Sequence, residues 1–271
     1  MQNKGGSALV GMDTTNNNLF VAYRGSSNIQ NWIQNVSIHI AACIQNLNSL
    51  GPGVCSLVEA VDAYPTLLYA SKYSWSNIKP HSFMQVKFVK TSPYPDMPDV
   101  SVELGFWEWY NYLLPGVTSA LQETAKKYGV YTVAVTGHSA GASCATLHAF
   151  DLARGADATA GFTLAQVVTF GSPRTGDENF YSTHAELIPA SQYVQWRVTH
   201  YHDMVPHMPQ ELVGYHHVST EVYYDEPSTT HQTCDGSGED PDCSNSCGPT
   251  HCTSVSDHLD YLNTPLGGDA C

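Results

Sequence analysis

The sequence predicts an α/β protein with a central, mostly parallel or mixed sheet that is flanked by helices. Short apolar segments rich in β-branched residues alternate along the chain with segments of helical periodicity. The chain has 271 residues, 42% of them hydrophobic, which is enough to bury such a sheet in one domain. Since no internal repeat is visible either, we expect a single domain over residues 1–271.

The predicted strands are short runs of apolar residues bounded by polar turns. Residues 8–12 and 19–23 lie on either side of the polar turn 13–18, which is typical of a hairpin or of two adjacent strands. Further strands are expected over 130–135, 164–170 and 193–199, with 215–224 as another candidate.

Two longer stretches have helical periodicity. The first covers about 102–127 and contains Pro115, which we expect to kink or end the helix. The second covers 140–154 and directly follows the strand predicted over 130–135. The stretch 41–101 has few periodic segments, and we interpret it as an irregular insertion.

The charge of the chain excludes some classes of partner. Asp and Glu number 25 against 11 Lys and Arg, for a formal net charge of −14. Such a surface repels phosphate backbones, so we expect no nucleic-acid partner. No apolar run is long enough to span a bilayer. The first residues, MQNKGG, lack the apolar core of a signal peptide, so we expect that a signal has been removed or that the sequence starts after it.

Eight cysteines indicate an oxidising compartment, and we expect a secreted protein with disulfides. The candidate pairs bracket short polar loops: Cys234 with Cys243, Cys247 with Cys252, and Cys43 with Cys55. Zinc binding is the alternative, but no two-plus-two ligand spacing with a short knuckle is present. We expect Cys144 to be a buried free thiol, and Cys271 has no evident partner.

The strongest chemical signal is the segment Gly137-His138-Ser139-Ala140-Gly141, between a predicted strand and a predicted helix. A serine on such a turn is exposed in a strained conformation and is a candidate nucleophile. The backbone N–H of Ala140 would point at a developing oxyanion. In the alternative interpretation Ser139 is only a helix N-cap. Small residues at the start of the helix would let it approach the sheet: Gly141, Ala142 and Ala145.

A serine nucleophile needs a histidine to accept its proton and a carboxylate to orient that histidine. In α/β-hydrolases the acid and then the histidine follow the serine along the chain. Asp203, after the strand predicted over 193–199, and His258 fit this order. Other residues could fill these roles: Asp225, Asp257 and Asp260 as the acid, and His200, His202, His207 and His251 as the base.

Six motifs together resemble the fungal-type class 3 lipases, which have the α/β-hydrolase fold. They are YRGSSNIQNWIQN, LGFWEWY, TVAVTGHSAG, TFGSPRTGD, HDMVPHMP and DHLDYL, and they occur in the family's order. The resemblance implies a catalytic triad of Ser139, Asp203 and His258, with Ser26 as the second oxyanion donor beside Ala140. It also implies that residues 28–36 form an amphipathic lid through Ile29, Trp32 and Ile33. A helix packed on the core is the alternative for this segment.

The chain also departs from the family pattern. We expect the family's first helices to be missing from this sequence, because the YRGS loop follows only two predicted strands after Met1. Ala140 stands where many relatives carry leucine, and the stretch 38–101 is longer than usual. Cys234 and Cys243 match a disulfide spacing of the family, whereas Cys271 resembles a terminal cysteine that pairs with an N-terminal one.

We therefore expect a carboxylic ester hydrolase, most simply a triacylglycerol lipase that acts at lipid–water interfaces through an acyl-enzyme. The alternatives are a feruloyl-type or short-chain esterase of the same family, a phospholipase and, in another class, a catalytically silent lipid-binding protein. The mechanism needs no metal or organic cofactor. The expected partners are an ester or lipid substrate and a transient lipid surface, and the protein is expected to be a monomer.

Overall fold

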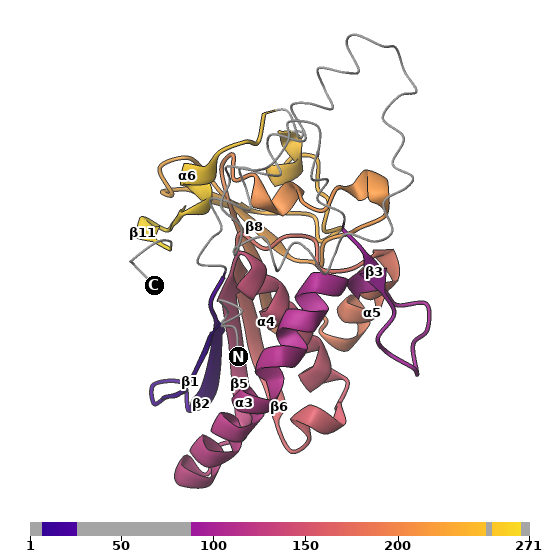
Figure 1. Ribbon diagram of the computed structural model, residues 1–271. Helices are drawn as coiled ribbons and strands as arrows, with labels where there is room; N and C mark the ends of the chain where they lie inside the picture. Colours follow the sequence, from indigo (N-terminus) through magenta and orange to yellow (C-terminus); the bar gives the residue numbers. More distant parts are fainter. Residues whose placement is uncertain (1–6, 26–87, 248–250, 267–271) are drawn as a thin grey trace, which may run out of the picture. The chain divides into compact units, whose positions relative to one another are not determined.

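A mixed sheet of seven strands forms the centre of the molecule in a computed structural model, which describes residues 7–25, 88–247 and 251–266 (Figure 1). The strands, in their order across the sheet, are β1 (Ala8–Asp13), β2 (Asn18–Tyr23), β5 (Thr132–His138), β6 (Thr163–Phe170), β7 (Val194–His200), β8 (Glu221–Tyr224) and β9 (His231–Thr233). The five strands β2, β5, β6, β7 and β8 run parallel, and the edge strands β1 and β9 are antiparallel to their neighbours. The predicted mostly parallel sheet is confirmed.

The hairpin of β1 and β2 forms as its pattern predicts. Its turn is closed by Asp13, whose carboxylate accepts hydrogen bonds from the backbone N–H groups of Thr15 and Asn16. Every second side chain of β2 is buried, and Leu19 and Val21 pair in register with Val133 and Val135 of β5. The alternation of a half-buried strand therefore brings β2 against the strand that leads to the GxSxG segment.

Three helices follow from apolar faces and capping residues: α3 (Leu104–Tyr128), α4 (Ala140–Ala153) and α5 (Glu178–Leu187). The Glu103 carboxylate accepts from the Phe106 N–H at the start of α3, and the Asp177 carboxylate accepts from the Phe180 N–H at the start of α5. These bonds satisfy donors that have no partner inside a helix. The sequence interpretation did not find α5.

Pro115 does not end its helix, and the expectation of a termination there is wrong. Helix α3 continues from Leu104 to Tyr128 because it is anchored on both sides of the proline, by Leu114 before it and by Val117 and Leu121 after it. Pro115 itself is exposed, so the carbonyl that loses its intrahelical donor faces solvent, where water can bind it.

The three helices lie against one face of the sheet (Figure 1). Helix α4 contacts β2, β5 and β6, and α3 contacts β1, β2 and α4. Phe180 of α5 packs against Phe150 of α4, with ring centroids 4.9 Å apart. On the opposite face, Val194 and Trp196 of β7 are exposed. The core of the described residues therefore lies between this sheet and α3, α4 and α5.

The structure corrects the bounds of two predicted segments. Of the candidate strand 215–224, only the last four residues form a strand, because 215–220 are held by separate contacts such as the bridge between Gly176 and His216. The end of the predicted irregular insertion, 41–101, belongs to the core, since Tyr94 and Val100 are buried there. Residues 41–87 lie outside the described part of the chain.

The remaining described elements are short. They are the strands β3 (Lys90–Thr91), β4 (Val102–Glu103), β10 (Asp260–Tyr261) and β11 (Thr264–Pro265), the helix α6 (Val255–His258) and four 3₁₀ turns at Asp157–Thr159, Val205–His207, Glu211–Val213 and Ser244–Ser246. Among the described residues, no helix is both long and apolar enough to cross a bilayer.

Several sequence predictions lie outside the described residues. They concern Ser26, the lid residues Ile29, Trp32 and Ile33, the cysteines Cys43, Cys55 and Cys271, and the N-terminal residues 1–6.

Candidate active site

Ser139 occupies a tight turn between β5 and α4. Its backbone has φ 58° and ψ −134°, a conformation that L-residues rarely adopt. A Cβ on Gly137 would collide with the carbonyl of Gly141, so the turn requires a glycine at position 137. The predicted strained serine between a strand and a helix is therefore present.

The Ser139 side chain does not cap its helix. It makes no capping hydrogen bond, although Ser139 stands at the N-cap position of α4. Its Oγ is buried and has no hydrogen-bond partner among the described residues. The N-cap alternative does not explain this side chain, whereas a nucleophile needs such an unengaged hydroxyl.

Asp203 and His258 form a buried pair. Asp203 lies in the loop after β7 and His258 ends α6, and the His258 Nδ1 is 2.9 Å from the Asp203 Oδ2. Both side chains are almost completely shielded from solvent. The Nδ1–H donates to the carboxylate, which leaves Nε2 as the nitrogen that can accept a proton. His258 Nε2 is buried and has no hydrogen-bond partner in the described part of the chain.

Two further donors hold the Asp203 carboxylate. The Val205 N–H donates to Oδ1 at 2.8 Å, and the Tyr261 hydroxyl donates to Oδ2 at 2.5 Å. Burial by itself would raise the pKa of Asp203, but the neighbouring His258 charge and these hydrogen bonds lower the pKa below its ordinary value. Burial and the Asp203 charge raise the pKa of Tyr261 well above its ordinary value. Asp203 is thus ionised and Tyr261 keeps the proton that it donates.

The loop of the acid and the turn of the histidine are joined through their backbones. Ser254 donates its N–H to the His202 carbonyl at 3.0 Å and forms a parallel bridge with Asp203. The Ser254 side chain also caps α6 by accepting from the Asp257 N–H. These bonds fix the distance between two segments that are about 50 residues apart in the sequence, and so position the pair.

His138 brings the serine turn to the histidine. Its ring stacks on the His258 ring with centroids 4.5 Å apart, and its Nε2 donates to the His258 carbonyl at 2.8 Å. Burial, and next the His258 charge, lower the pKa of His138 to about 4, so this ring is neutral at neutral pH. Because Ser139 follows His138 directly, Ser139 and His258 lie in the same buried region. No hydrogen bond joins their side chains, and such bonds commonly tighten only when substrate binds.

The other candidate acids and bases have different surroundings. Asp225 closes an exposed turn with Thr229 and Thr230. Asp257 accepts from the His202 N–H, and the His202 ring stacks on Tyr201. The Ser139 hydroxyl has no hydrogen-bond partner among the described residues, so it is bonded to none of these residues. The same holds for the remaining candidates, Asp260, His200, His207 and His251.

The oxyanion donors are only partly described. Ala140 is the first residue of α4, so its N–H has no acceptor within the helix. Gly25, which precedes Ser26, lies so close to the serine turn that a Cβ would be 2.8 Å from the His138 carbonyl and 3.0 Å from the Ser139 Cβ. The loop that leads to Ser26 therefore approaches Ser139 at Gly25.

Similarity to known families identifies the kind of protein in which these residues occur. Residues 20–213 match the family model for lipase (class 3). The chain belongs to the class 3 lipase family. The lipase of Rhizomucor miehei is 34% identical over 181 residues, which cover 66% of this chain and 48% of that protein. Secreted mono- and diacylglycerol lipase A of Penicillium cyclopium is 28% identical over 220 residues, 81% of this chain and 52% of that protein. The chain thus spans about half the length of these relatives.

Solved structures confirm the fold of this class 3 lipase family member. The Rhizomucor miehei lipase in complex with its propeptide superposes with a TM-score of 0.69 at 26% identity, over 98% of this chain and 68% of that chain. A triacylglycerol lipase whose catalytic centre is described as a serine protease triad superposes with a TM-score of 0.68 at 26% identity, over 97% of this chain and 78% of that chain. The predicted α/β-hydrolase fold is confirmed.

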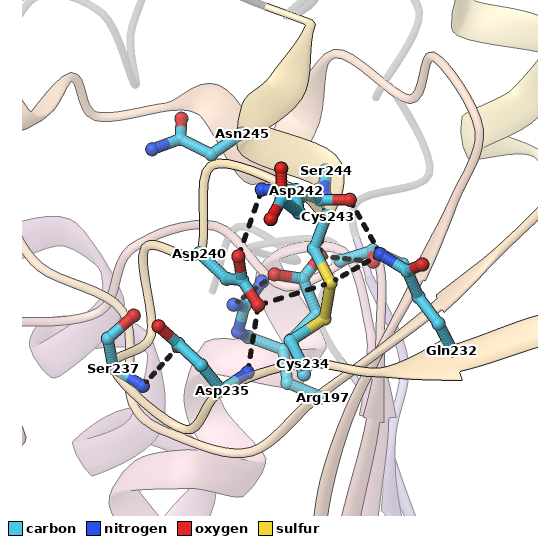
Figure 2. The surroundings of a disulfide bond; sticks show 12 residues. Arg197, Gln232, Cys234, Asp235, Ser237, Asp240, Asp242, Cys243, Ser244 and Asn245 are labelled. Atoms are coloured by element: carbon cyan, nitrogen blue, oxygen red, sulfur yellow. Dashed lines mark hydrogen bonds and ion pairs between the residues drawn. A yellow bond between two sulfur atoms is a disulfide. The ribbon is translucent and has the colours of Figure 1, made fainter.

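Two disulfides close short loops in the described C-terminal part of the chain. Cys234 and Cys243 are bonded, as are Cys247 and Cys252, while Cys144 is free and buried. Figure 2 shows Asp240 inside the first loop, where its carboxylate accepts from the N–H groups of Asp235 and Asp242. These bonds give the loop a defined shape.

Glu239 of that loop connects it to the segment after Asp203. Its two carboxylate oxygens accept from the Arg174 guanidinium at 2.8 and 2.6 Å. Arg174 also donates to the Pro209 carbonyl at 3.1 Å, and the Met208 carbonyl accepts from its backbone N–H at 2.8 Å. The disulfide loop is therefore tied to residues 208–209, close to the acid.

The zinc alternative finds no support where the chain is described. The Glu221 carboxylate and the sulfurs of Cys234 and Cys243 lie within 4.8 Å of one another. The sulfurs are bonded to each other, and Glu221 already accepts from Arg197 and Thr199. This group therefore offers no thiolate and no free carboxylate to a metal ion.

Sequence reasoning missed two residues that contact the Asp203–His258 pair. One is Tyr261, the donor to Asp203. The other is Gly171, at φ 53°, where an added Cβ would lie 2.9 Å from the Asp203 Oδ2, the His258 Nδ1 and the Tyr261 hydroxyl. Both residues belong to motifs quoted above, TFGSPRTGD and DHLDYL, but only the fold shows that these motifs meet.

Proposed function

We propose that the protein is a serine hydrolase of carboxylic esters, of the triacylglycerol lipase type, with Ser139, Asp203 and His258 as its catalytic triad. The observation that supports this proposal is the buried, ion-paired Asp203–His258 couple, whose histidine stacks on His138, the residue before a strained serine with an unengaged hydroxyl. Membership of the class 3 lipase family supports it.

The chemistry follows from the hydrogen-bond geometry. His258 accepts the Ser139 proton at Nε2 while the hydroxyl oxygen attacks the ester carbonyl. Ionised Asp203 stabilises the resulting imidazolium through Nδ1. The N–H of Ala140, with Ser26 as the second donor, stabilises the oxyanion. His258 then protonates the leaving alcohol, and a water molecule activated by the same imidazole releases the acyl group.

The substrate proposal rests on the relatives and on the charge. Proteins named lipase and mono- and diacylglycerol lipase are similar to this chain, so we propose a neutral acylglycerol at a lipid–water interface, with the segment 28–36 and its Ile29, Trp32 and Ile33 as the lid. The formal charge of −14 disfavours anionic lipid surfaces. Two disulfides and relatives named as secreted support secretion.

A fluorophosphonate probe tests the catalytic proposal. We expect a single adduct on Ser139 by peptide mapping, and the Ser139→Ala protein should lose both the adduct and about 10⁴-fold or more of the ester hydrolysis. Ser182→Ala, on the exposed face of α5, is the matched control and should keep both. A folded Ser139→Ala protein with wild-type activity would refute the triad, and an unlabelled wild type would favour a silent lipid-binding protein.

Substrate form separates the lipase from an esterase. A lipase should gain activity sharply when a long-chain ester exceeds its solubility. A smooth saturation curve on soluble short-chain or aromatic esters would favour the feruloyl-type or short-chain esterase instead.

A further inference from the structure

His200 is a buried histidine that the catalytic mechanism does not use. It ends β7 and is only 5% exposed. Its Nδ1 lies 3.0 Å from the carbonyl oxygen of Asp257, and its Nε2 lies 3.0 Å from the carbonyl oxygen of Glu226. The ring therefore bridges α6 and the turn that follows β8.

The chemistry of the two contacts defines the protonation state of this ring. A carbonyl oxygen only accepts hydrogen bonds, and a neutral imidazole has a single N–H to donate. If His200 were neutral, one ring nitrogen would direct its lone pair at a carbonyl oxygen 3.0 Å away. Only the imidazolium form donates at both positions, so the geometry is that of a charged histidine.

The bridge ends next to the triad. The Asp257 carbonyl belongs to the peptide bond that joins Asp257 to His258. The His200 ring also lies edge-on to Tyr261, with centroids 5.7 Å apart, and Tyr261 donates to the Asp203 carboxylate. His200 thus touches the backbone of the proposed base and the side chain that supports the proposed acid.

We propose that His200, as an imidazolium, is a positioning residue that clamps the His258 turn beside Asp203. This inference rests on the proposed function, because its effect on rate operates through His258. In this role the charged His200 ring touches neither the substrate nor the reacting atoms.

The charged and titratable groups around His200 agree with this state. Asp257 of α6 contributes its carboxylate and its carbonyl, Glu226 its carbonyl, and Asp260 of β10 its backbone, while the phenol of Tyr261 keeps its proton. Burial alone would lower the pKa of His200, but the carbonyls of Glu226 and Asp257 and then the Asp257 charge raise the pKa above its ordinary value. The imidazolium is therefore kept to higher pH than a free histidine and is lost as the pH rises through that raised pKa.

Proton release from His200 should lower activity. The proposed base His258 must be neutral to act, which lowers activity on the acid side of the profile. Loss of the clamp would lower activity on the alkaline side. A bell-shaped profile of kcat is expected, with His200 responsible for the alkaline limb.

The first experiment measures kcat and KM against pH on a soluble short-chain ester for the wild type and for His200→Gln. We expect kcat of the variant at neutral pH to fall between about tenfold and 100-fold, with KM changed by less than about twofold, because only the alignment of the base is lost. The alkaline limb should disappear. His231→Gln, at an exposed histidine of β9, is the matched control and should keep both kcat and the limb.

The second experiment does not depend on activity or on a variant of His200. Nitrogen and proton chemical shifts of the histidine rings, recorded by NMR in the Ser139→Ala protein, should show His200 protonated on both nitrogens at pH 6.5, with a transition at higher pH. A neutral His200 at pH 6.5, or wild-type kcat and pH profile in folded His200→Gln, would overturn the proposal. If His200 titrates as expected but the wild type hydrolyses no ester, the proposed function fails and the clamp on the turn stands.

Discussion

At the residue scale, the Asp203 carboxylate shows what a buried charge requires. It accepts from His258, Tyr261 and the Val205 N–H, so three donors replace the water that burial removes. The donor that sequence reasoning missed, Tyr261, is three residues after His258 and points back to the same carboxylate oxygen that His258 binds. A charge held in this way orients an imidazole without taking its proton.

The Tyr261→Phe substitution tests this support. Removing the hydroxyl leaves one carboxylate lone pair unpaired, so the free energy of unfolding should fall by about 1.5–3 kcal/mol and kcat by about tenfold, with KM unchanged. The pKa of Asp203 should rise, because one of the interactions that lower it is lost. Urea unfolding and steady-state kinetics measure these effects. Tyr131→Phe, at an exposed tyrosine, should change neither, and equal losses in both variants would contradict the role of Tyr261.

At the element scale, the close approach of α4 to the sheet determines where Ser139 lies. Gly141 faces the end of β2, where an added Cβ would collide with the carbonyl of Tyr23 and lie 2.7 Å from the carbonyl carbon of Arg24. The predicted role of small residues at the start of this helix is confirmed, since Ala142 and Ala145 are fully buried. The backbone of the strand and the helix, rather than side chains, forms this contact.

Two glycine substitutions in helices separate packing from helix propensity. Gly141→Ala should destabilise the fold by about 1–3 kcal/mol, since neither backbone can yield easily. Gly116→Ala, at an exposed position of α3 with nothing within 4 Å, should stabilise it by about 0.5–1 kcal/mol, because alanine is the better helix former. Urea unfolding at neutral pH compares the two. Equal effects of the two changes would show that the contact with β2 is unimportant.

At the scale of the whole molecule, buried neutral histidines determine how stability depends on pH. Burial lowers the pKa of His148 and His184 to about 3, and that of His207 to about 4. In the unfolded chain each titrates near its ordinary value of about 6.5. Below that pH the unfolded state binds more protons than the folded state, so stability falls as the pH falls from about 6.5 toward 4. His200, with its raised pKa, contributes in the opposite direction.

The free energy of unfolding, measured by urea titration, should therefore decrease between pH 7 and pH 5, by up to about 1.4 kcal/mol per pH unit for each buried neutral histidine. The lowered pKa of Asp203 adds a second loss at lower pH, below the unfolded value of about 3.9. His184→Gln should reduce the slope, because it removes one of these groups. His231→Gln, at an exposed histidine, is the control and should leave the slope unchanged. A free energy of unfolding that does not vary with pH would contradict the assignment.

The amino-acid sequence was sufficient to predict the features that depend on local chain chemistry. Short apolar runs bounded by polar turns were sufficient to predict β1, β2, β5, β6 and β7, because strand formers and turn formers are local signals. The Gly137–Gly141 motif located the strained serine turn, because Gly137 is required by a backbone collision only four residues along the chain. The order of residue types was enough to name Asp203 and His258 among several candidates, but not to exclude Asp257 or His200.

Which distant side chains meet depends on the three-dimensional fold. Asp203, His258, Tyr261 and Gly171 come together because the carboxyl ends of parallel strands lie at one edge of the sheet, and the loop after β7 is joined there to the turn of α6. Helix α3 continues through Pro115 because its buried face on either side outweighs one lost hydrogen bond. Contacts between remote segments depend on burial and on hydrogen bonds that follow no periodic pattern in the sequence. Local patterns therefore do not predict them.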